Sequence, residues 1–226
     1  MDIEKTILKK IFKCNKEYNL FNKTERIIIS LSGGKDSISL LKLLTKIHSP
    51  SLIYPIHIYP YKDDKVLSYI KNFSENTLSM ANPVKFLKNP LYKKDLLSCY
   101  ECARGRRKTV FEEADKQKIY KIALGHTKND VSETFLMNVI YSGNKDTIKP
   151  FQTFFDGKFQ IIRPLYMVEE KELLRYSDIY HITPQNYHCS GKESNKRENI
   201  RAFLRNLKDD YVIQRVFNAA VIKKQR

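Results

Sequence analysis

Hydrophobic and polar residues recur along the chain with two different periods, and each period predicts a different kind of element. Apolar side chains at helical spacing between charges predict an amphipathic helix over residues 1–20. Further helical patterns cover residues 40–47, 64–80, 106–116, 129–140 and 169–179. Short apolar runs, which suit buried strands, occupy residues 26–31, 52–59, 84–87 and 119–123, and the stretch 161–165 leads into the last of those helices.

Strands that alternate with helices predict a parallel sheet with helices on both faces. We therefore expect an α/β fold with a Rossmann-like parallel sheet of about five strands and a helical C-terminal extension. Residues 92–102 form a polar connection in this interpretation, and residues 141–160 form an irregular loop near the site. The expected organisation is an N-terminal helix over residues 1–22, a main domain over residues 23–180 and a basic helical segment over residues 181–226.

A glycine-containing turn joins the first expected strand to the helix after it. Its six residues are Ser32, Gly33, Gly34, Lys35, Asp36 and Ser37. At such a turn the backbone N–H groups and the helix dipole form an anion site, and glycine lets a phosphate approach the backbone closely. Lys35 adds a positive charge, and a carboxylate such as Asp36 beside phosphates is suited to bind Mg²⁺ or to orient a group. The spacing differs from the Walker pattern and from the dinucleotide-binding fingerprint.

This turn resembles the Ser-Gly-Gly-x-Asp-Ser loop of the PP-loop ATP pyrophosphatases, and the resemblance extends over about residues 27–207. It implies the PP-loop ATPase fold, which is similar to that of the adenine nucleotide alpha hydrolases. In that family the loop holds the pyrophosphate of ATP while a substrate oxygen attacks the α-phosphate, which leaves an adenylated intermediate. The resemblance therefore implies that residues 32–37 bind ATP and that Lys35 and Asp36 are catalytic.

A second stretch, residues 125–134, resembles the family's Gly-His-x-x-Asp-Asp-x-x-Gln/Glu-Thr block. It follows an expected strand, at the edge of the sheet where α/β proteins usually bind ligands. Gly125 and His126 are implied to contact ATP, although His126 could equally cap the strand. Asn129 replaces the first aspartate of the block. Asp130 is then the expected Mg²⁺ ligand or substrate-orienting group, and we count it as catalytic.

Three of the four cysteines match a family pattern, and Cys14 does not. The pattern is the Cys-x-x-Cys-x-Arg-x-Arg-Arg stretch and third cysteine of the tRNA 2-thiocytidine synthetases. The matching positions are Cys99, Cys102, Arg104, Arg106, Arg107 and Cys189. In those enzymes the three cysteines hold a [4Fe–4S] cluster, for which thiolates are suitable ligands. The alternatives are a zinc site completed by His188 or another residue, a dithiol that carries a persulfide, and an inert packed role.

The composition indicates that the protein has an acidic binding partner. The 226 residues carry a formal net charge of +16, which is typical of a nucleic-acid binder, although a solvated basic surface would have the same composition. The resemblance implies tRNA as the partner, with Arg104, Arg106, Arg107 and Arg163 as its contacts. Arg163 could instead face phosphate, or be an ordinary surface charge beside a turn.

The resemblance implies a reaction in which the C2 oxygen of a cytidine in the tRNA anticodon loop, at position 32, is adenylated and then replaced by sulfur. The expected cofactors are ATP, Mg²⁺ and a [4Fe–4S] cluster, with zinc as the alternative to the cluster. The expected sulfur donor is a cysteine desulfurase or free sulfide. Thiolation of a uridine, lysidine synthesis and a non-catalytic ATP-dependent tRNA-binding module are the alternative functions.

The sequence also bears on the location of the protein in the cell. No stretch approaches the length of an apolar membrane span, and the N-terminus has no unbroken apolar run of the secretory type. We therefore expect a cytoplasmic protein with no membrane partner, and a homodimer stays open. One further departure from the family follows the second expected strand, where relatives often carry an acidic residue and this chain has Tyr59, Pro60 and Tyr61.

Overall fold

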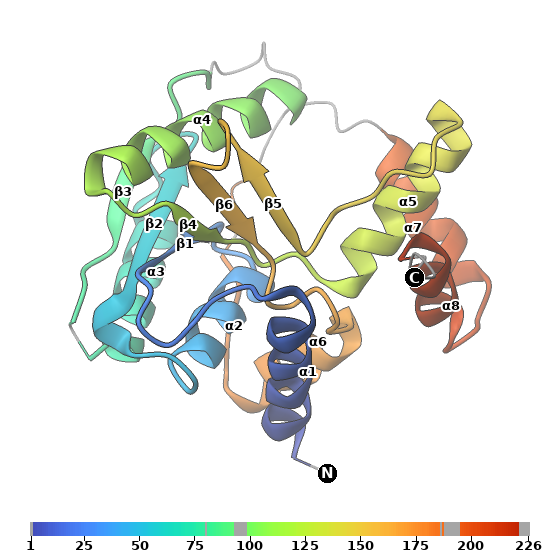
Figure 1. Ribbon diagram of the computed structural model, residues 1–226, viewed down its shortest axis with the longest axis horizontal. Coiled ribbons are helices and arrows are strands. Elements are labelled where there is room, and N and C mark those ends of the chain that lie inside the picture. The colour runs from blue at the N-terminus through green and yellow to red at the C-terminus, as the bar shows by residue number, and fades with distance from the viewer. Residues whose placement is uncertain (1, 80, 93–98, 186, 188–194, 222–226) are drawn as a thin grey trace.

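Six strands of the chain form a mostly parallel sheet. The computed structural model describes residues 2–79, 81–92, 99–185, 187 and 195–221. The strand order is β3-β2-β1-β4-β6-β5 (Figure 1), and every neighbouring pair is parallel except β5 and β6. The strands are β1 (Ile27–Leu31), β2 (Ile53–Tyr59), β3 (Lys85–Lys88), β4 (Lys121–Ala123), β5 (Phe151–Phe154) and β6 (Phe159–Ile162).

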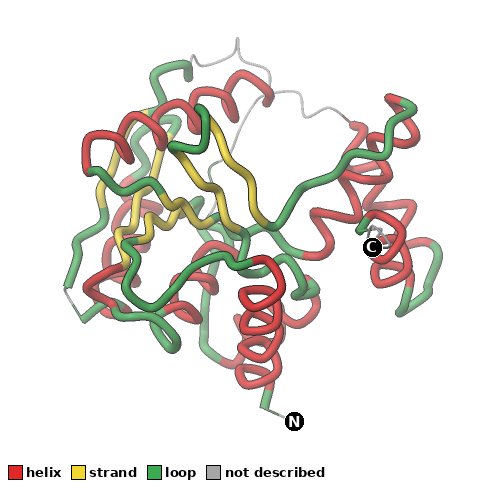
Figure 2. Tube along the Cα trace, viewed as in Figure 1, coloured by secondary structure: helices red, strands yellow, loops and turns green. Residues whose placement is uncertain are grey.

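Helices connect and flank these strands (Figure 2). They are α1 (Ile3–Tyr18), α2 (Lys35–Leu44), α3 (Asp64–Thr77), α4 (Cys99–Gln117), α5 (Lys128–Ser142), α6 (Glu170–Ile179), α7 (Asn195–Asn206) and α8 (Val212–Ala220), with a short 3₁₀ turn at Pro50–Leu52. Local capping starts several of them: the Asp2 carboxylate accepts the Glu4 backbone N–H at 3.0 Å at the start of α1. None of the helices in these ranges is long and apolar enough to cross a membrane.

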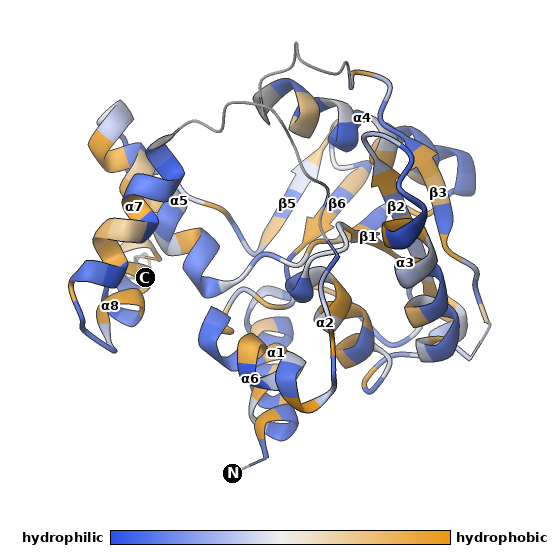
Figure 3. Cartoon of the chain, turned by 180° about the vertical axis from the view of Figure 1, so that it is seen from behind, coloured by the Kyte–Doolittle hydropathy of each residue, from blue (hydrophilic) through white to orange (hydrophobic). Residues whose placement is uncertain are grey.

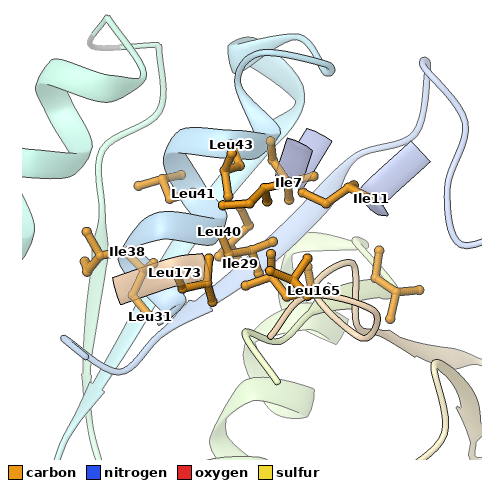
Figure 4. Packing of buried hydrophobic residues seen from close by; sticks show 14 of the residues in the cluster. Ile7, Ile11, Ile29, Leu31, Ile38, Leu40, Leu41, Leu43, Leu165 and Leu173 are labelled. Carbon is orange, nitrogen blue, oxygen red and sulfur yellow. The ribbon is translucent and has the colours of Figure 1, made fainter. Parts of the chain in front are cut away.

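The residues of β1 alternate between two hydrophobic cores, one on each face of the sheet. Ile29 and Leu31 belong to the larger core, which α1, α2 and α6 cover (Figure 4). Ile28 belongs to the smaller core, which α4 covers. These β1 side chains are at most 2% exposed, and burying such a side chain stabilises the fold by about 1.5–3 kcal/mol. The cores therefore hold the central strands in the register that brings their loops together.

Helices α5, α7 and α8 gather at the side of the molecule away from β3 (Figures 1 and 2). Lys128 of α5 donates to Gln214 Oε1 of α8 at 2.6 Å, and the Phe217 ring of α8 packs on Tyr166 with centroids 5.2 Å apart. At the other end of the chain, α1 contacts α6 through the Lys10–Glu172 ion pair at 2.6 Å. The predicted helical C-terminal extension is confirmed. The division at residues 22 and 180 stays a prediction.

The sheet has one more strand than the expected five. Residues 151–154, within the stretch predicted to be an irregular loop, form the edge strand β5 and pair antiparallel with β6. The hairpin turns through Phe155, Asp156 and Gly157, whose φ values are +55°, +52° and +87°. A strand of four residues with two polar members carries little periodic signal, and Figure 3 colours β6 more strongly hydrophobic than β5.

Helix α4 begins at Cys99, earlier than the predicted start at residue 106. The expected polar connection over residues 92–102 is therefore wrong in its last part. Exposed charges such as Glu101 and Arg104 in the first turns gave no apolar stripe from which a helix could be recognised. Gly105 also lowers helix propensity, yet a Cβ at that position would lie 2.2 Å from Asn89 Oδ1. Packing against Asn89, the residue after β3, thus overrides the local preference.

Candidate active site

The candidate site lies where the loops after β1 and β4 meet. From these two neighbouring strands the sheet continues to β2 and β3 on one side and to β6 on the other, so the loops diverge at a switch point of the kind where α/β proteins bind ligands. Gly125 stands at the contact, since a Cβ there would lie 3.0 Å from both Cα and N of Ser37. Glycine therefore lets the two loops touch backbone to backbone.

The turn from β1 into α2 is organised by serine hydroxyls. Ser37 Oγ donates to the Gly34 carbonyl at 3.0 Å and accepts the Ser32 backbone N–H at 3.1 Å. Gly34 is the N-cap of α2 and has no side chain to cap it, and Gly33 adopts a φ of +90°, which favours glycine. The first turn of α2 can therefore direct its backbone N–H groups at an anion, in agreement with the predicted phosphate loop.

A cavity of about 540 Å³ opens beside this turn, a volume suited to a small-molecule ligand. Its polar wall is formed by Ser32, Gly34, Asp36, Ser37, Arg106, Arg107, Gly125, His126, Asp130 and Arg163. Its apolar wall includes Val110, Phe111, Leu124, Phe154 and Ile161. Most residues that we predicted to bind ATP thus line one cavity, together with three of the four arginines that we predicted to contact tRNA.

Gly33 and Lys35 belong to the phosphate loop but do not line the cavity. The Gly33 carbonyl accepts the Gln185 backbone N–H at 3.1 Å. Lys35 Nζ lies 2.7 Å from Glu170 Oε1 of α6 and 3.2 Å from Asp36 Oδ1. Burial lowers the pKa of Lys35, but the two carboxylates outweigh that effect and raise it above its usual value. The lysine therefore stays charged beside the phosphate loop.

Asp36 combines burial with an incompletely paired carboxylate. Burial raises its pKa, which Lys35 only partly offsets. Its Oδ1 atom is buried and accepts no aligned hydrogen bond from the residues that the structure describes. Lys35 Nζ lies within ion-pair distance of this oxygen, at 3.2 Å, so it has a cationic neighbour although it accepts no aligned hydrogen bond. A carboxylate oxygen of this kind at the cavity wall is a ligand that a hard cation such as Mg²⁺ prefers. Asp36 therefore fits the predicted role of metal ligand.

His126 and Arg163 form one hydrogen-bonded unit in the cavity wall. Arg163 Nε donates to His126 Nδ1 at 3.1 Å, so the remaining proton of the neutral ring is on Nε2. Burial lowers the pKa of His126 to about 4, and burial also lowers the pKa of Arg163 to about 10. Arg163 is only 7% exposed. This position favours a phosphate in the cavity over an exposed tRNA backbone as the partner of Arg163.

Asp130 has a structural partner as well as a place in the cavity. Its Oδ2 accepts the Thr127 backbone N–H at 2.8 Å in a capping box that starts α5. Its Oδ1 lies 3.8 Å from Arg197 of α7. One turn later, the buried Glu133 pairs with Arg201 Nε at 3.0 Å. The family block in α5 thus also anchors α7 next to the cavity.

The structure describes part of the predicted cysteine triad. Cys102 is a free, half-buried cysteine in α4, and Cys99 begins that helix. Cys189 and His188 lie outside the described residues, and among the residues that are described no three metal-ligating side chains converge. Cys14 is buried in α1, and burial raises the pKa of its thiol to about 12. That burial agrees with its exclusion from the triad.

The three arginines after Cys102 in α4 differ in whether they line the cavity. All three are exposed, but Arg106 and Arg107 line the cavity and Arg104 does not. An RNA strand that crosses the mouth of the cavity could contact both groups through its phosphates. Their predicted contact with tRNA stays a prediction.

Sequence reasoning gave no role to several residues that support the site. Asn129 Oδ1 accepts the Glu170 backbone N–H at 2.9 Å, which places Glu170 against Lys35. His57 of β2 contacts the Leu31 carbonyl through Nδ1 at 2.9 Å and the Tyr187 hydroxyl through Nε2 at 2.8 Å. These pairs join residues far apart in sequence and follow no short motif.

The chain is similar in sequence to known tRNA-modifying enzymes. The family described as the PP-loop domain matches residues 3–208. The tRNA-cytidine(32) 2-sulfurtransferase of Aliivibrio fischeri (strain MJ11) is 30% identical over 205 residues, covering 83% of this chain and 64% of that protein. The enzyme of the same name from Aliivibrio salmonicida (strain LFI1238) is 30% identical over 220 residues, covering 89% of this chain and 69% of that protein. The chain thus spans just under two thirds of the A. fischeri protein.

A solved structure shows the same fold. The U34-tRNA thiolase NcsA from Methanococcus maripaludis, determined with its [4Fe-4S] cluster, superposes with a TM-score of 0.79 at 17% sequence identity. The match covers 96% of this chain and 77% of the thiolase. The predicted α/β fold of the PP-loop type is confirmed.

Proposed function

We propose that this chain, which belongs to the PP-loop domain family, is an ATP-dependent tRNA thiolation enzyme that replaces the C2 oxygen of cytidine 32 with sulfur. The two Aliivibrio relatives support this substrate and reaction. The observation that carries the proposal is that the phosphate loop and helix α4, which carries Cys99 and Cys102, line the same cavity. Ser32 and Asp36 of the phosphate loop line it, and so does Ala103, the residue after Cys102.

ATP occupies this cavity in the proposal, with its pyrophosphate moiety at the turn of residues 32–37. The N–H groups at the start of α2 and the Lys35 ammonium group stabilise the negative charge that develops on the leaving pyrophosphate. Arg163, held by His126, provides a further donor for a phosphate oxygen. Gly125 lets the second loop lie against this turn.

Mg²⁺ would be held by Asp36, whose Oδ1 accepts no aligned hydrogen bond from the described residues, and by Asp130 in the first turn of α5. When bound there, the ion would neutralise the negative charge that develops on the phosphate oxygens. Both carboxylates line the cavity, and the first turns of α2 and α5 carry them. Their catalytic assignment, like that of Lys35, belongs to the proposal.

The reaction has two displacements. In the first, the C2 oxygen of the cytidine attacks the α-phosphorus of ATP, an O–P bond forms, and the bond to the bridging oxygen breaks as pyrophosphate leaves. In the second, a sulfide attacks C2, a C–S bond forms, and the C–O bond breaks as AMP leaves with the former C2 oxygen. Hydrosulfide, ATP and cytidine thus give 2-thiocytidine, AMP and pyrophosphate, which takes up the hydrosulfide proton.

A [4Fe–4S] cluster held by Cys99, Cys102 and Cys189 fits the part of this site that the structure describes. Cys102 is free, half-buried and accepts a hydrogen bond from an amide N–H at its sulfur, which suits an electron-rich thiolate ligand. The likeness in fold to a thiolase with its [4Fe-4S] cluster supports the same assignment. When bound through three thiolates, such a cluster supplies an iron without a protein ligand that can hold the incoming sulfide.

The remaining assignments concern partners. The basic helix α4 beside the cavity supports tRNA contact by Arg104, Arg106 and Arg107. The sulfur donor in the proposal is a cysteine desulfurase or free sulfide, and a tRNA substrate supports a cytoplasmic location. A homodimer stays open. Zinc in place of the cluster is the alternative that metal analysis tests.

The test is a single-turnover reaction of the anaerobically purified protein with ATP, sulfide and total tRNA. We expect AMP, pyrophosphate and 2-thiocytidine in equal amounts. ADP as the nucleotide product would contradict the PP-loop chemistry, and thiouridine would move the substrate to the class of the NcsA thiolase. ATP bound without turnover would favour a tRNA-binding module.

A further inference from the structure

Asn89 is a fully buried polar residue that the proposed reaction does not use. It follows β3, and its backbone N–H donates to the Tyr59 carbonyl at 2.8 Å, so the end of the sheet sets its position. Its side-chain amide donates to the Cys102 carbonyl at 3.0 Å and to the Cys102 sulfur at 3.4 Å. A buried side chain thus directs a hydrogen-bond donor at the one triad cysteine whose side chain is described.

The surroundings define which end of the amide faces the sulfur. The Leu91 backbone N–H lies 3.1 Å from Asn89 Oδ1, and of the two amide ends only the oxygen can accept it. The NH₂ group is therefore the end that faces Cys102, and its two hydrogens match the carbonyl and the sulfur. Gly105 of α4 closes the other side, because a Cβ there would lie 2.2 Å from Asn89 Oδ1. The amide has little freedom to turn away.

An N–H group directed at a ligand sulfur acts on a metal centre in two ways. It orients the ligand, and it withdraws electron density from the sulfur, which favours the more reduced state of an iron–sulfur cluster. A residue that only separated α4 from β3 would need no donor at the sulfur. The orientation of the Asn89 amide is therefore informative.

We propose that Asn89 is a positioning residue for the iron–sulfur centre, which fixes Cys102 as a ligand and raises the reduction potential of the centre through an N–H···S hydrogen bond. This inference rests on the proposed function, because it requires a cluster bound by Cys102. It adds a residue from the end of β3 to the cysteine site.

Two substitutions remove this hydrogen bond from opposite sides. Asn89→Leu replaces the amide by an apolar group of similar size, and Gly105→Ala displaces the amide without changing Asn89 itself. We expect both variants to shift the midpoint potential of the anaerobically purified full chain to more negative values in an EPR-monitored redox titration. We also expect iron loss to a chelator to become about tenfold faster, the usual effect of losing an outer-shell partner.

Asn82→Leu is the matched control, because Asn82 also uses its amide structurally, donating to the Ser51 and Ile53 carbonyls at 3.0 and 2.9 Å. It should lower the melting temperature without moving the potential. Loss of all iron in Asn89→Leu with unchanged ATP binding would support the positioning role. A cluster with unchanged potential and unchanged iron loss in both variants would overturn the role of Asn89 alone. A wild-type protein without an iron–sulfur cluster would overturn cluster binding and this inference together.

Discussion

The buried carboxylate of Asp36 lowers the stability of the folded protein when it is ionised. Burial raises its pKa, and Lys35 compensates only in part. One of its oxygens is buried without an aligned hydrogen bond. A group whose folded pKa is raised destabilises the folded protein once it ionises, so the loss appears as the pH rises. A residue retained at such a cost is typical of a binding site.

Asp36→Asn should therefore separate catalysis from stability. The amide keeps the shape and removes the buried charge, so we expect the melting temperature at pH 7 to be unchanged or higher. Mg²⁺-dependent release of pyrophosphate should fall by at least about 100-fold, as expected when a group that stabilises transition-state charge is lost. The exposed Asp156→Asn change is the control for charge, and a melting temperature that drops only in Asp36→Asn would argue for a structural role.

Glu170 competes with phosphate for the same lysine. Its Oε1 lies 2.7 Å from Lys35 Nζ, and its position depends on the hydrogen bond from its backbone N–H to Asn129. The side chain is partly exposed, so this ion pair contributes little to stability. Asn129 replaces an aspartate of the family block. It still supports the phosphate loop, because it positions Glu170, which pairs with Lys35.

Glu170→Gln should tighten ATP binding. The substitution removes a negative charge beside the phosphate loop and leaves Lys35 free to pair with the pyrophosphate moiety. We expect the Kd for ATP to fall by about two- to fivefold, in line with the modest energy of a partly exposed ion pair. Isothermal titration calorimetry with Glu17→Gln, an exposed charge on α1, as the control would measure this. Weaker binding would mean that Glu170 orients Lys35 for ATP.

At the level of elements, the site depends on two loops that touch at Gly125. Gly125→Ala would place a Cβ 3.0 Å from the backbone of Ser37 and push the loops apart. We expect a stability loss of about 1–3 kcal/mol, as for other overpacked positions, and a KM for ATP that rises at least tenfold. Gly143→Ala is the control, since no atom lies within 4 Å of its added Cβ and only its φ of +63° is strained. It should lose stability and keep its KM.

The arginines of α4 allow a test of RNA contact by salt dependence. Each phosphate contact that is lost should weaken tRNA binding and reduce the slope of log K against log salt by about 1. We expect this for Arg104→Gln and Arg107→Gln, measured by filter binding between low and moderate salt. Lys9→Gln, an exposed charge on α1, should leave the slope unchanged. An unchanged slope in the α4 variants would mean that these arginines make no phosphate contacts with tRNA and serve only the cavity or solubility.

Elements with a strong period could be predicted from the sequence, and elements set by tertiary contacts could not. The buried apolar run of β1 predicted the strand, and the glycine turn after it predicted the phosphate loop. The edge strand β5 and the first turns of α4 carry mixed polar residues, and they form because β6 and Asn89 offer them partners. The same reason explains the missed pairs His57–Tyr187 and Lys35–Glu170, since no local pattern encodes a contact between distant segments.

For the whole molecule, acid sensitivity should reveal two histidines that are held neutral. His57 lies in β2 and His126 follows β4, the strands on either side of β1. Burial lowers the pKa of each histidine to about 4. Both rings are hydrogen-bonded in the neutral form, His57 to the Leu31 carbonyl and His126 to Arg163. Burial also raises the pKa values of the Asp36 and Glu133 carboxyl groups. Between pH 6.5 and 5 the contribution of one histidine is therefore isolated by comparing its substitution variant with the wild type.

We expect the free energy of unfolding to fall as the pH is lowered through this range. An unfolded histidine binds a proton near its ordinary pKa of 6.5, whereas the folded rings do so only near 4, so the unfolded chain takes up more protons between these values. Each ring adds a slope of up to about 1.4 kcal/mol per pH unit. In urea unfolding at pH 7, 6 and 5, His57→Gln should be less stable than the wild type at pH 7 and lose less as the pH falls. His181→Asn, at an exposed position with a φ of +52° that asparagine tolerates, should parallel the wild type. If His57→Gln also paralleled the wild type, His57 would titrate alike in the folded and unfolded chains, and its buried position between Leu31 and Tyr187 would be wrong.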